Sequence, residues 1–169
     1  SASGGNEVDG NSNSFSLLSG SNTVSGSSNT LTGASANKID GNGNTVSGGA
    51  GNVIGGDGNT ITAGALNAIS GSGNSVTLGD GNAIAGNGNT VNIGGGNIIA
   101  GSGNTLTPAA GNLVAGNGNN LDPAALNAVI GDSNSVSDGM LNGVVGYGNT
   151  LAGSDENIVA GSGNKFDAS

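Results

Sequence analysis

Residues 59–73 read NTITAGALNAISGSG, and these fifteen residues contain the pattern of the whole chain. The stretch divides into an eight-residue half that begins at Asn59 and a seven-residue half that begins at Asn67. In each half an apolar residue, Ile61 or Ile69, follows two positions after the Asn. A spacing of two with β-branched residues predicts a short strand in which the Asn and the apolar residue point to the same side.

The pattern continues along nearly the whole chain. The steps from one such Asn to the next alternate seven and eight residues from Asn22 to Asn164, after one step of nine from Asn13. The inward apolar positions are Val8, Phe15, Val24, Leu31, Ile39, Val46, Ile54, Ile61, Ile69, Val76, Ile84, Val91, Ile99, Leu106, Val114, Leu121, Val129, Val136, Val144, Leu151, Val159 and Phe166. We therefore predict an all-β fold, a two-sided β-solenoid of about eleven fifteen-residue coils with two parallel sheets. It forms one domain over residues 1–169, with cap regions at about 1–21 and 164–169.

Glycine and asparagine mark the turns and the interior of each coil. Every seven-residue half has Gly two positions after its apolar residue, as at Gly71 and Gly86, which predicts a corner with positive φ. We expect the inward Asn side chains to stack, with their amides bonding along the axis and to turn backbone. At the ends we expect Phe15 and Phe166 to cover the core. Charged residues near the termini, at Glu7, Asp9, Lys38, Asp40, Lys165 and Asp167, discourage end-to-end association.

The composition excludes several classes of function. The 169 residues have a net charge of −9, with two Lys plus Arg, eleven Asp plus Glu, no Cys and no His. So few basic residues exclude a nucleic acid or an anionic membrane surface as the partner. Without Cys and His the chain lacks thiolate chemistry and the commonest general base and metal ligand. We expect no enzyme activity, no metal and no other cofactor.

The outward residues of the eight-residue halves form two ranks of hydroxyl side chains in coils two to seven. These candidate site residues are Thr30, Thr32, Thr45, Ser47, Thr60, Thr62, Ser75, Thr77, Thr90, Asn92, Thr105 and Thr107. They are uncharged, and each Thr holds a methyl beside a hydroxyl on a stiff side chain. The pattern decays after coil seven, beginning with Asn120 and Asp122.

The outward residues of the seven-residue halves are apolar from coil four onward. This second candidate surface includes Ala68, Ala83, Ala85, Ile98, Ala100, Leu113, Ala115, Ala128, Ile130, Val145, Ile158 and Ala160. A contiguous exposed apolar patch indicates an interaction site. We expect it to contact a second copy or a neighbouring domain.

The alternation of N-x-V-x-G with N-x-V-x-x-G resembles the ice recrystallisation inhibition, or antifreeze, proteins of grasses. The motif stands in NAISGSG from Asn67, NTITAGAL from Asn59 and NSVTLGDG from Asn74. The resemblance implies a secreted β-roll without enzyme activity, whose flat face holds ordered water and binds ice. This chain is richer in Gly and Ala than the family pattern, and its shorter half is more apolar. We expect the hydroxyl ranks to meet ice, with the apolar surface as the alternative.

Other functions fit single features of the sequence. A structural or adhesive solenoid would use the apolar surface for protein association, which Ile98→Lys would abolish. A calcium-binding β-roll is suggested by GGDGNTIT at residues 55–62, but such repeats have nine-residue halves, and Asp57, Asp80 and Asp132 are scattered. Catalysis by a carboxylate pair would need convergent acids, whereas Asp155 and Glu156 are adjacent and would point apart in a strand.

Overall fold

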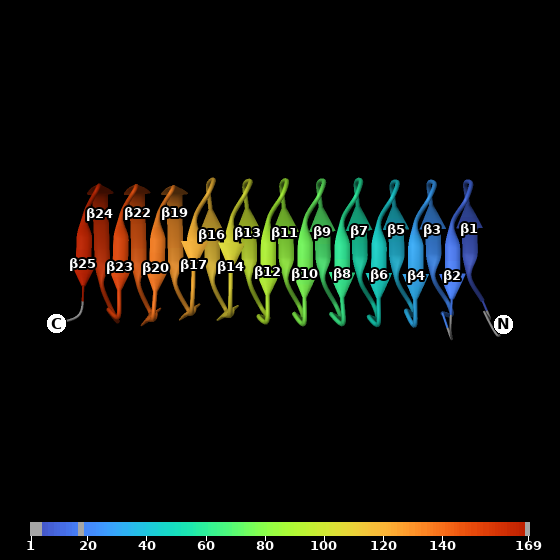
Figure 1. Ribbon diagram of the computed structural model, residues 1–169, viewed down its shortest axis with the longest axis horizontal. Coiled ribbons are helices and arrows are strands. Elements are labelled where there is room, and N and C mark those ends of the chain that lie inside the picture. Colours follow the sequence, from blue (N-terminus) through green and yellow to red (C-terminus); the bar gives the residue numbers. More distant parts are fainter. Residues whose placement is uncertain (1–4, 17–18, 168–169) are drawn as a thin grey trace.

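The protein is a rod of stacked coils, in agreement with the predicted β-solenoid. The computed structural model describes residues 5–16 and 19–167. Figure 1 shows the coils in a straight row, from the first strand near the N-terminus (blue) to the last strand near the C-terminus (red). Each coil contributes one strand to each of two eleven-stranded sheets, in which neighbouring strands are parallel.

The two long sheets contain the two kinds of half-repeat. Sheet A, from the seven-residue halves, contains β1 (Glu7–Asp9), β3 (Thr23–Ser25), β5 (Lys38–Asp40), β7 (Val53–Gly55), β9 (Ala68–Ser70), β11 (Ala83–Ala85), β13 (Ile98–Ala100), β16 (Leu113–Ala115), β19 (Ala128–Asp132), β22 (Gly143–Tyr147) and β24 (Ile158–Ser162). Sheet B, from the eight-residue halves, contains β2 (Ser14–Ser16), β4 (Thr30–Thr32), β6 (Thr45–Ser47), β8 (Thr60–Thr62), β10 (Ser75–Thr77), β12 (Thr90–Asn92), β14 (Thr105–Leu106), β17 (Asn120–Leu121), β20 (Ser135–Ser137), β23 (Thr150–Ala152) and β25 (Lys165–Asp167). Coil one is β1 with β2, and coil eleven is β24 with β25.

The core is the predicted pair of apolar ladders. The apolar residue two positions after each Asn points inward, and from Val24 to Val159 all of these residues are buried. Each pairs with its equivalent in the next coil, so that Val76 lies between Ile61 and Val91. Burial of one such side chain contributes roughly 1.5–3 kcal/mol, and the repetition sums this along the rod.

The inward Asn residues form the hydrogen-bonded ladder that we expected. The Oδ1 atom of Asn74 accepts bonds from both the backbone N–H and the Nδ2 of Asn89, each at 3.0 Å. Asn89 Nδ2 also donates to the carbonyl of Gly101 in a turn, at 2.8 Å. Among the described residues no buried polar side-chain atom lacks a partner. The ladder therefore fixes the register of the coils, and its hydrogen bonds offset the cost of removing the amides from water.

The corner glycines have the positive φ that the sequence predicts, and a second constraint as well. Gly86 has φ of 131°, and a Cβ placed on it would collide with the carbonyl oxygen of Gly101 in the next coil. Two residues later Gly88 has φ of 62° with open space around it, and Ser133 occupies the equivalent position in a later coil. Only the first glycine is therefore required by stacking as well as by backbone conformation.

A third, three-stranded sheet, which the repeat pattern did not indicate, lies along the edge formed by the longer turns. It contains β15 (Ala109–Ala110), β18 (Ala124–Ala125) and β21 (Gly139–Met140). In earlier coils the residue after the sheet B strand has positive φ and donates its N–H to the previous coil, as Ile93 does to Thr77 at 2.8 Å. Pro108 and Pro123 stand at this position, and proline has neither the N–H nor access to positive φ. The backbone of the longer turn therefore follows a different path in the two coils that contain Pro108 and Pro123.

The ends of the rod are less covered than we expected. Phe15 is half-buried and packs against the core, but Phe166 is 41% exposed. The cap regions expected at about 1–21 and 164–169 fall partly on residues 1–4, 17–18 and 168–169, which lie outside the described residues. The described part of the chain contains no helix long and apolar enough to cross a membrane.

Candidate functional site

The hydroxyl residues of sheet B lie on one face and in register. The first rank runs Thr30, Thr45, Thr60, Ser75, Thr90, Thr105, with each residue paired to the next across parallel strands. The second rank runs Thr32, Ser47, Thr62, Thr77, Asn92. We call these two ranks the hydroxyl face. Thr107, predicted to extend the second rank, follows the end of β14 at Leu106. It is half-buried like its rank, and its backbone N–H donates to the carbonyl of Leu121 in the next coil at 2.9 Å.

The side chains of the hydroxyl face are closely packed against one another. All residues of the two ranks are half-buried except Thr62, which is exposed. In a parallel stack each side chain is flanked by its equivalents at about 4.8 Å along the axis, and the two ranks are roughly 7 Å apart along the strand. Because Thr has a restricted χ1, these neighbours hold the methyl and hydroxyl groups in a repeated arrangement.

Most hydroxyls of this face have no partner among the residues that the structure describes. Among the described residues, the ranks contribute one side-chain hydrogen bond, between Thr32 and Ser16 of the first coil, at 3.1 Å between the two hydroxyl oxygens. The hydroxyls of Thr45, Thr60, Thr77 and Thr90 make none in this part of the chain. They therefore remain available to solvent, on a surface whose neighbouring groups are uncharged.

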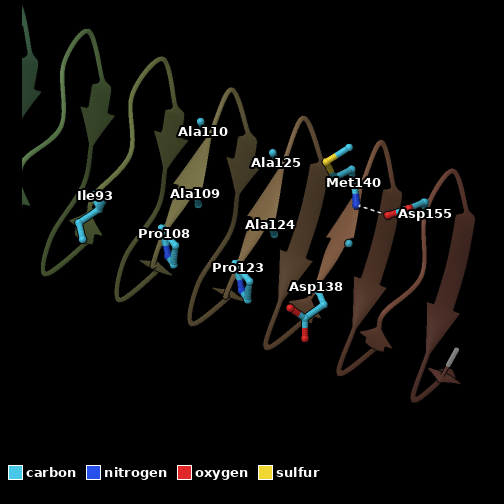
Figure 2. Close-up of a pocket in the computed structure, with 11 residues that line it drawn as sticks. Ile93, Pro108, Ala109, Ala110, Pro123, Ala124, Ala125, Asp138, Met140 and Asp155 are labelled. Atoms are coloured by element: carbon cyan, nitrogen blue, oxygen red, sulfur yellow. Dashed lines mark hydrogen bonds between the residues drawn. The ribbon is translucent and has the colours of Figure 1, made fainter.

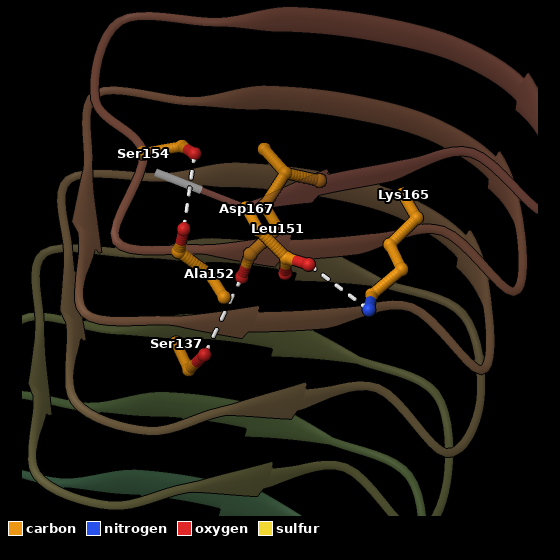
Figure 3. Close-up of polar contacts among 6 residues, drawn as sticks. All are labelled: Ser137, Leu151, Ala152, Ser154, Lys165 and Asp167. Carbon is orange, nitrogen blue, oxygen red and sulfur yellow. Dashed lines mark hydrogen bonds and ion pairs between the residues drawn. The ribbon is translucent and has the colours of Figure 1, made fainter. Parts of the chain in front are cut away.

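The C-terminal part of sheet B differs from this pattern, as Figure 3 shows. Ser137 Oγ donates to the carbonyl of Leu151 at 3.5 Å, and Ser154 Oγ donates to that of Ala152 at 3.1 Å. In the last strand Lys165 forms an exposed ion pair with Asp167 at 2.9 Å. The regular surface ends after coil seven, where the sequence predicted that the hydroxyl pattern decays, and charged residues occupy the outward positions of the last strand.

The second candidate surface covers the outer side of sheet A from β7 to β24, and we call it the apolar face. Its large side chains are exposed, with Val53 at 51%, Ile98 at 56% and Ile158 at 92%. Between Val53 and Ile98 lies a shallow depression whose floor includes Ala68, Ala83 and Ala85. All twelve residues predicted for this surface point outward on one sheet, where they alternate with the buried ladder.

The longer-turn edge carries an apolar groove that sequence reasoning missed. The groove has a volume of about 450 Å³ and is lined by Ile93, both prolines and the third sheet. Figure 2 shows Ile93, Pro108, Pro123 and Asp138 in a row along successive coils. The spacing of fifteen between the two prolines was the available signal, because it gives them equivalent positions in neighbouring coils.

The acidic residues of the turns act as hydrogen-bond acceptors between coils. Asp57 accepts from the backbone N–H of Asn42 at 2.7 Å, and Asp80 accepts from that of Ala65 at 2.7 Å. Asp155 accepts from the N–H of Met140 at 2.7 Å (Figure 2). No group of three acidic residues in the described ranges is arranged to hold a metal ion. These carboxylates thus stabilise the stacking of turns.

Comparison with known proteins leaves the function open. No protein-family model matches the chain, and no curated protein matches it. Among solved structures, it is similar to the one described as "Crystal Structure of the polySia specific acetyltransferase NeuO", with 18% identity, 97% of this chain and 84% of that chain covered, and a TM-score of 0.27. A similarity of this size carries no conclusion about activity. The β-solenoid implied by the resemblance to the grass antifreeze proteins agrees with the structure.

Proposed function

We propose that the protein binds ice through the hydroxyl face of sheet B. The observation that carries the proposal is the pair of in-register ranks, uncharged and half-buried, whose hydroxyls from Thr45 to Thr90 make no bond within the described chain. A surface of this kind can order a layer of water, because its groups repeat at fixed intervals in two directions. Charged groups would instead orient water around themselves and disturb that layer.

The two parts of the threonine side chain have separate roles in this proposal. The methyl groups restrict the water molecules between the ranks, and the hydroxyls anchor those molecules by hydrogen bonds. The intervals are set by the backbone, at about 4.8 Å between coils and roughly 7 Å between ranks. Since the strands are held by the Asn ladder and the buried core, the surface does not have to become ordered on binding, which favours adsorption.

The test is a bulky substitution in the middle of the face. Thr60→Tyr or Thr90→Tyr places a ring above the plane of the ranks, and we expect thermal hysteresis and inhibition of ice recrystallisation to fall several-fold. The ring lies on an outward position, so the melting temperature followed by circular dichroism should change little. Activity equal to that of the wild type in both variants would overturn the assignment of the face.

The matched comparison is Ala83→Tyr, an exposed position on the opposite face. If ice binding uses the hydroxyl face, this variant keeps its activity. Should Ala83→Tyr abolish activity while Thr60→Tyr retains it, the apolar face binds ice instead. Ice crystals grown in a dilute solution of the wild-type protein provide the direct observation, because adsorption changes the shape of the crystal. Crystals that grow as in buffer alone would exclude ice binding by either face.

The proposal also implies a location outside the cell, as does the family that the sequence resembles. Detection of the protein only inside its producing cells would argue against this role.

A further inference from the structure

We propose that two copies of the chain associate through their apolar faces, with the two rods parallel and a two-fold axis along the rod. The large outward side chains of one copy then lie opposite small ones in the same coil of the other. This interface is independent of the proposed ice binding, because the hydroxyl face lies on the other side of the molecule and remains uncovered. A dimer of this kind presents two hydroxyl faces on opposite outer sides.

The sizes of the outward residues carry the first part of the argument. From coil four to coil eleven, the two outward residues that flank the inward apolar residue of sheet A are never both large. The pairs in chain order are Val53/Gly55, Ala68/Ser70, Ala83/Ala85, Ile98/Ala100, Leu113/Ala115, Ala128/Ile130, Gly143/Val145 and Ile158/Ala160. Six of these eight pairs combine one Val, Leu or Ile with one Gly or Ala.

The two-fold axis brings the large outward side chains of one copy opposite the small ones of the other. A two-fold axis along the rod keeps the order of the coils but reverses the strand direction of the second copy. The first outward residue of a coil therefore faces the second outward residue of the same coil. Ile98 faces Ala100 of the second copy, and Ile130 faces its Ala128. Large side chains thus enter spaces left by small ones, as in the dry interfaces between stacked sheets.

The charges of the first coils favour the same arrangement. Lys38 and Asp40 lie on the same outer side of sheet A, and both are exposed. The one ion pair within the described residues joins Lys165 to Asp167, so it does not involve Lys38. In the parallel dimer, Lys38 faces Asp40 of the second copy twice by symmetry. The acidic pair Glu7 and Asp9 meets its equivalent in coil one, at the exposed end where solvent screens the repulsion.

Antiparallel rods fit the same residues less well. In this arrangement the two-fold axis runs along the strands, and coils four to eleven of one copy overlap coils eleven to four of the other. Ile98 then lies against Leu113 and Val53 against Ile158, so that large side chains meet each other. The arrangement also leaves coil three beyond the end of the partner, where Lys38 has no opposing acid. The area supports a reversible dimer, because eleven coils at about 4.8 Å with a contact width of 10–15 Å bury on the order of 1,000–1,500 Å² in total.

Sedimentation velocity over a range of protein concentrations tests the interface. We expect a reversible monomer–dimer equilibrium for the wild type and a monomer for Leu113→Lys at every concentration measured. Asn120→Lys is the matched control, because it places the same charge on an exposed residue of sheet B in the same coil, and it should dimerise like the wild type. A wild type that stays monomeric, or a Leu113→Lys variant that still dimerises, would overturn the proposal.

Charge reversal in coil three tests the direction of the rods. In the parallel dimer Asp40→Lys places two lysines opposite each other, and we expect the dissociation constant to rise about tenfold. The double variant Lys38→Asp/Asp40→Lys restores opposite charges and should recover wild-type affinity. A dimer that responds to Leu113→Lys but not to Asp40→Lys would contradict the parallel arrangement.

A variant that fills the depression in coils five and six is expected to strengthen the dimer, whereas the two variants above weaken it. Both outward residues are small there, so two copies leave a gap between Ala85 and Ala83 of the partner copy. Ala85→Val adds two methyl groups on each chain, and we expect the dimer to tighten by about three- to tenfold. Weaker association of this variant would show that the two faces do not meet at these coils.

Discussion

The hydroxyl face and the apolar face are built on the same coils and the same backbone ladder, yet they differ in nearly every outward residue. Behind both lie an inward Asn and an inward Val, Ile or Leu in each half-repeat, and these residues form the fold. The difference teaches that the outward side chains are not needed for stacking. Selection could therefore change either face while the rod stayed intact, which makes the regularity of the hydroxyl ranks informative about function.

The largest loss of stability is expected from a substitution that disturbs the stacking of the coils, on which both faces depend. Gly86→Ala places a Cβ where it collides with the carbonyl of Gly101 and requires an alanine at φ of 131°. We expect a loss of more than about 4 kcal/mol in the free energy of unfolding, measured by urea denaturation followed by circular dichroism.

The control for this variant is Gly88→Ala, in the same turn. Its φ of 62° is the left-handed conformation and no atom lies near its Cβ. We expect a cost of about 1 kcal/mol. Equal stabilities of the two variants would contradict the role of coil-to-coil contact at Gly86.

A smaller loss is expected when one rung of the inward ladder is removed. Asn89→Ala leaves the backbone N–H and the Nδ2 of Asn104 without their acceptor, and the carbonyl of Gly101 without its donor. We expect the free energy of unfolding to fall by about 2–4 kcal/mol, because these groups are buried or partly buried. Asn87→Ala, which removes an exposed bond to Ser72, should cost at most about 1 kcal/mol. Similar losses in thermal or urea melts of the two variants would show that burial does not determine the value of the ladder.

A conservative change on the hydroxyl face separates stability from function. The Thr60 hydroxyl has no bond within the described residues, so Thr60→Val should change the free energy of unfolding by less than about 0.5 kcal/mol. If the hydroxyls anchor water, Thr60→Val also loses part of the ice-binding activity, because it removes one hydroxyl of the first rank. A clear stabilisation or destabilisation in urea would indicate that the hydroxyl takes part in folding, which would weaken the contrast between interior and surface.

The smallest effect is expected at the end of sheet B. Lys165 and Asp167 form their ion pair with both side chains largely exposed, at 70% and 56%. Solvent and salt screen such a pair, so Lys165→Ala should change stability by less than about 0.5 kcal/mol. A larger loss in thermal melts at low and high salt would mean that the pair protects the open end of the core.

The sequence by itself determined the fifteen-residue repeat and which residues of each coil point inward or outward. The period alternating between seven and eight residues, the apolar residue after each Asn and the corner glycines were enough to predict the coils, both long sheets and the residues on each face. This was possible because each half-repeat contacts chiefly its equivalents in the coils before and after, so local pattern and tertiary contact coincide.

The tertiary structure decided what depends on contacts between different positions of the coil. The collision that makes Gly86 necessary, while Gly88 is needed only for φ, appears once coils are stacked. The third sheet joins turn residues that lie side by side only after fifteen residues of chain have closed a coil. The exposure of Phe166 depends on how the last coil ends. The hydroxyls from Thr45 to Thr90 are available because the stacked coils of the described chain place no partner within hydrogen-bond distance of them, a relation between coils that no single repeat contains.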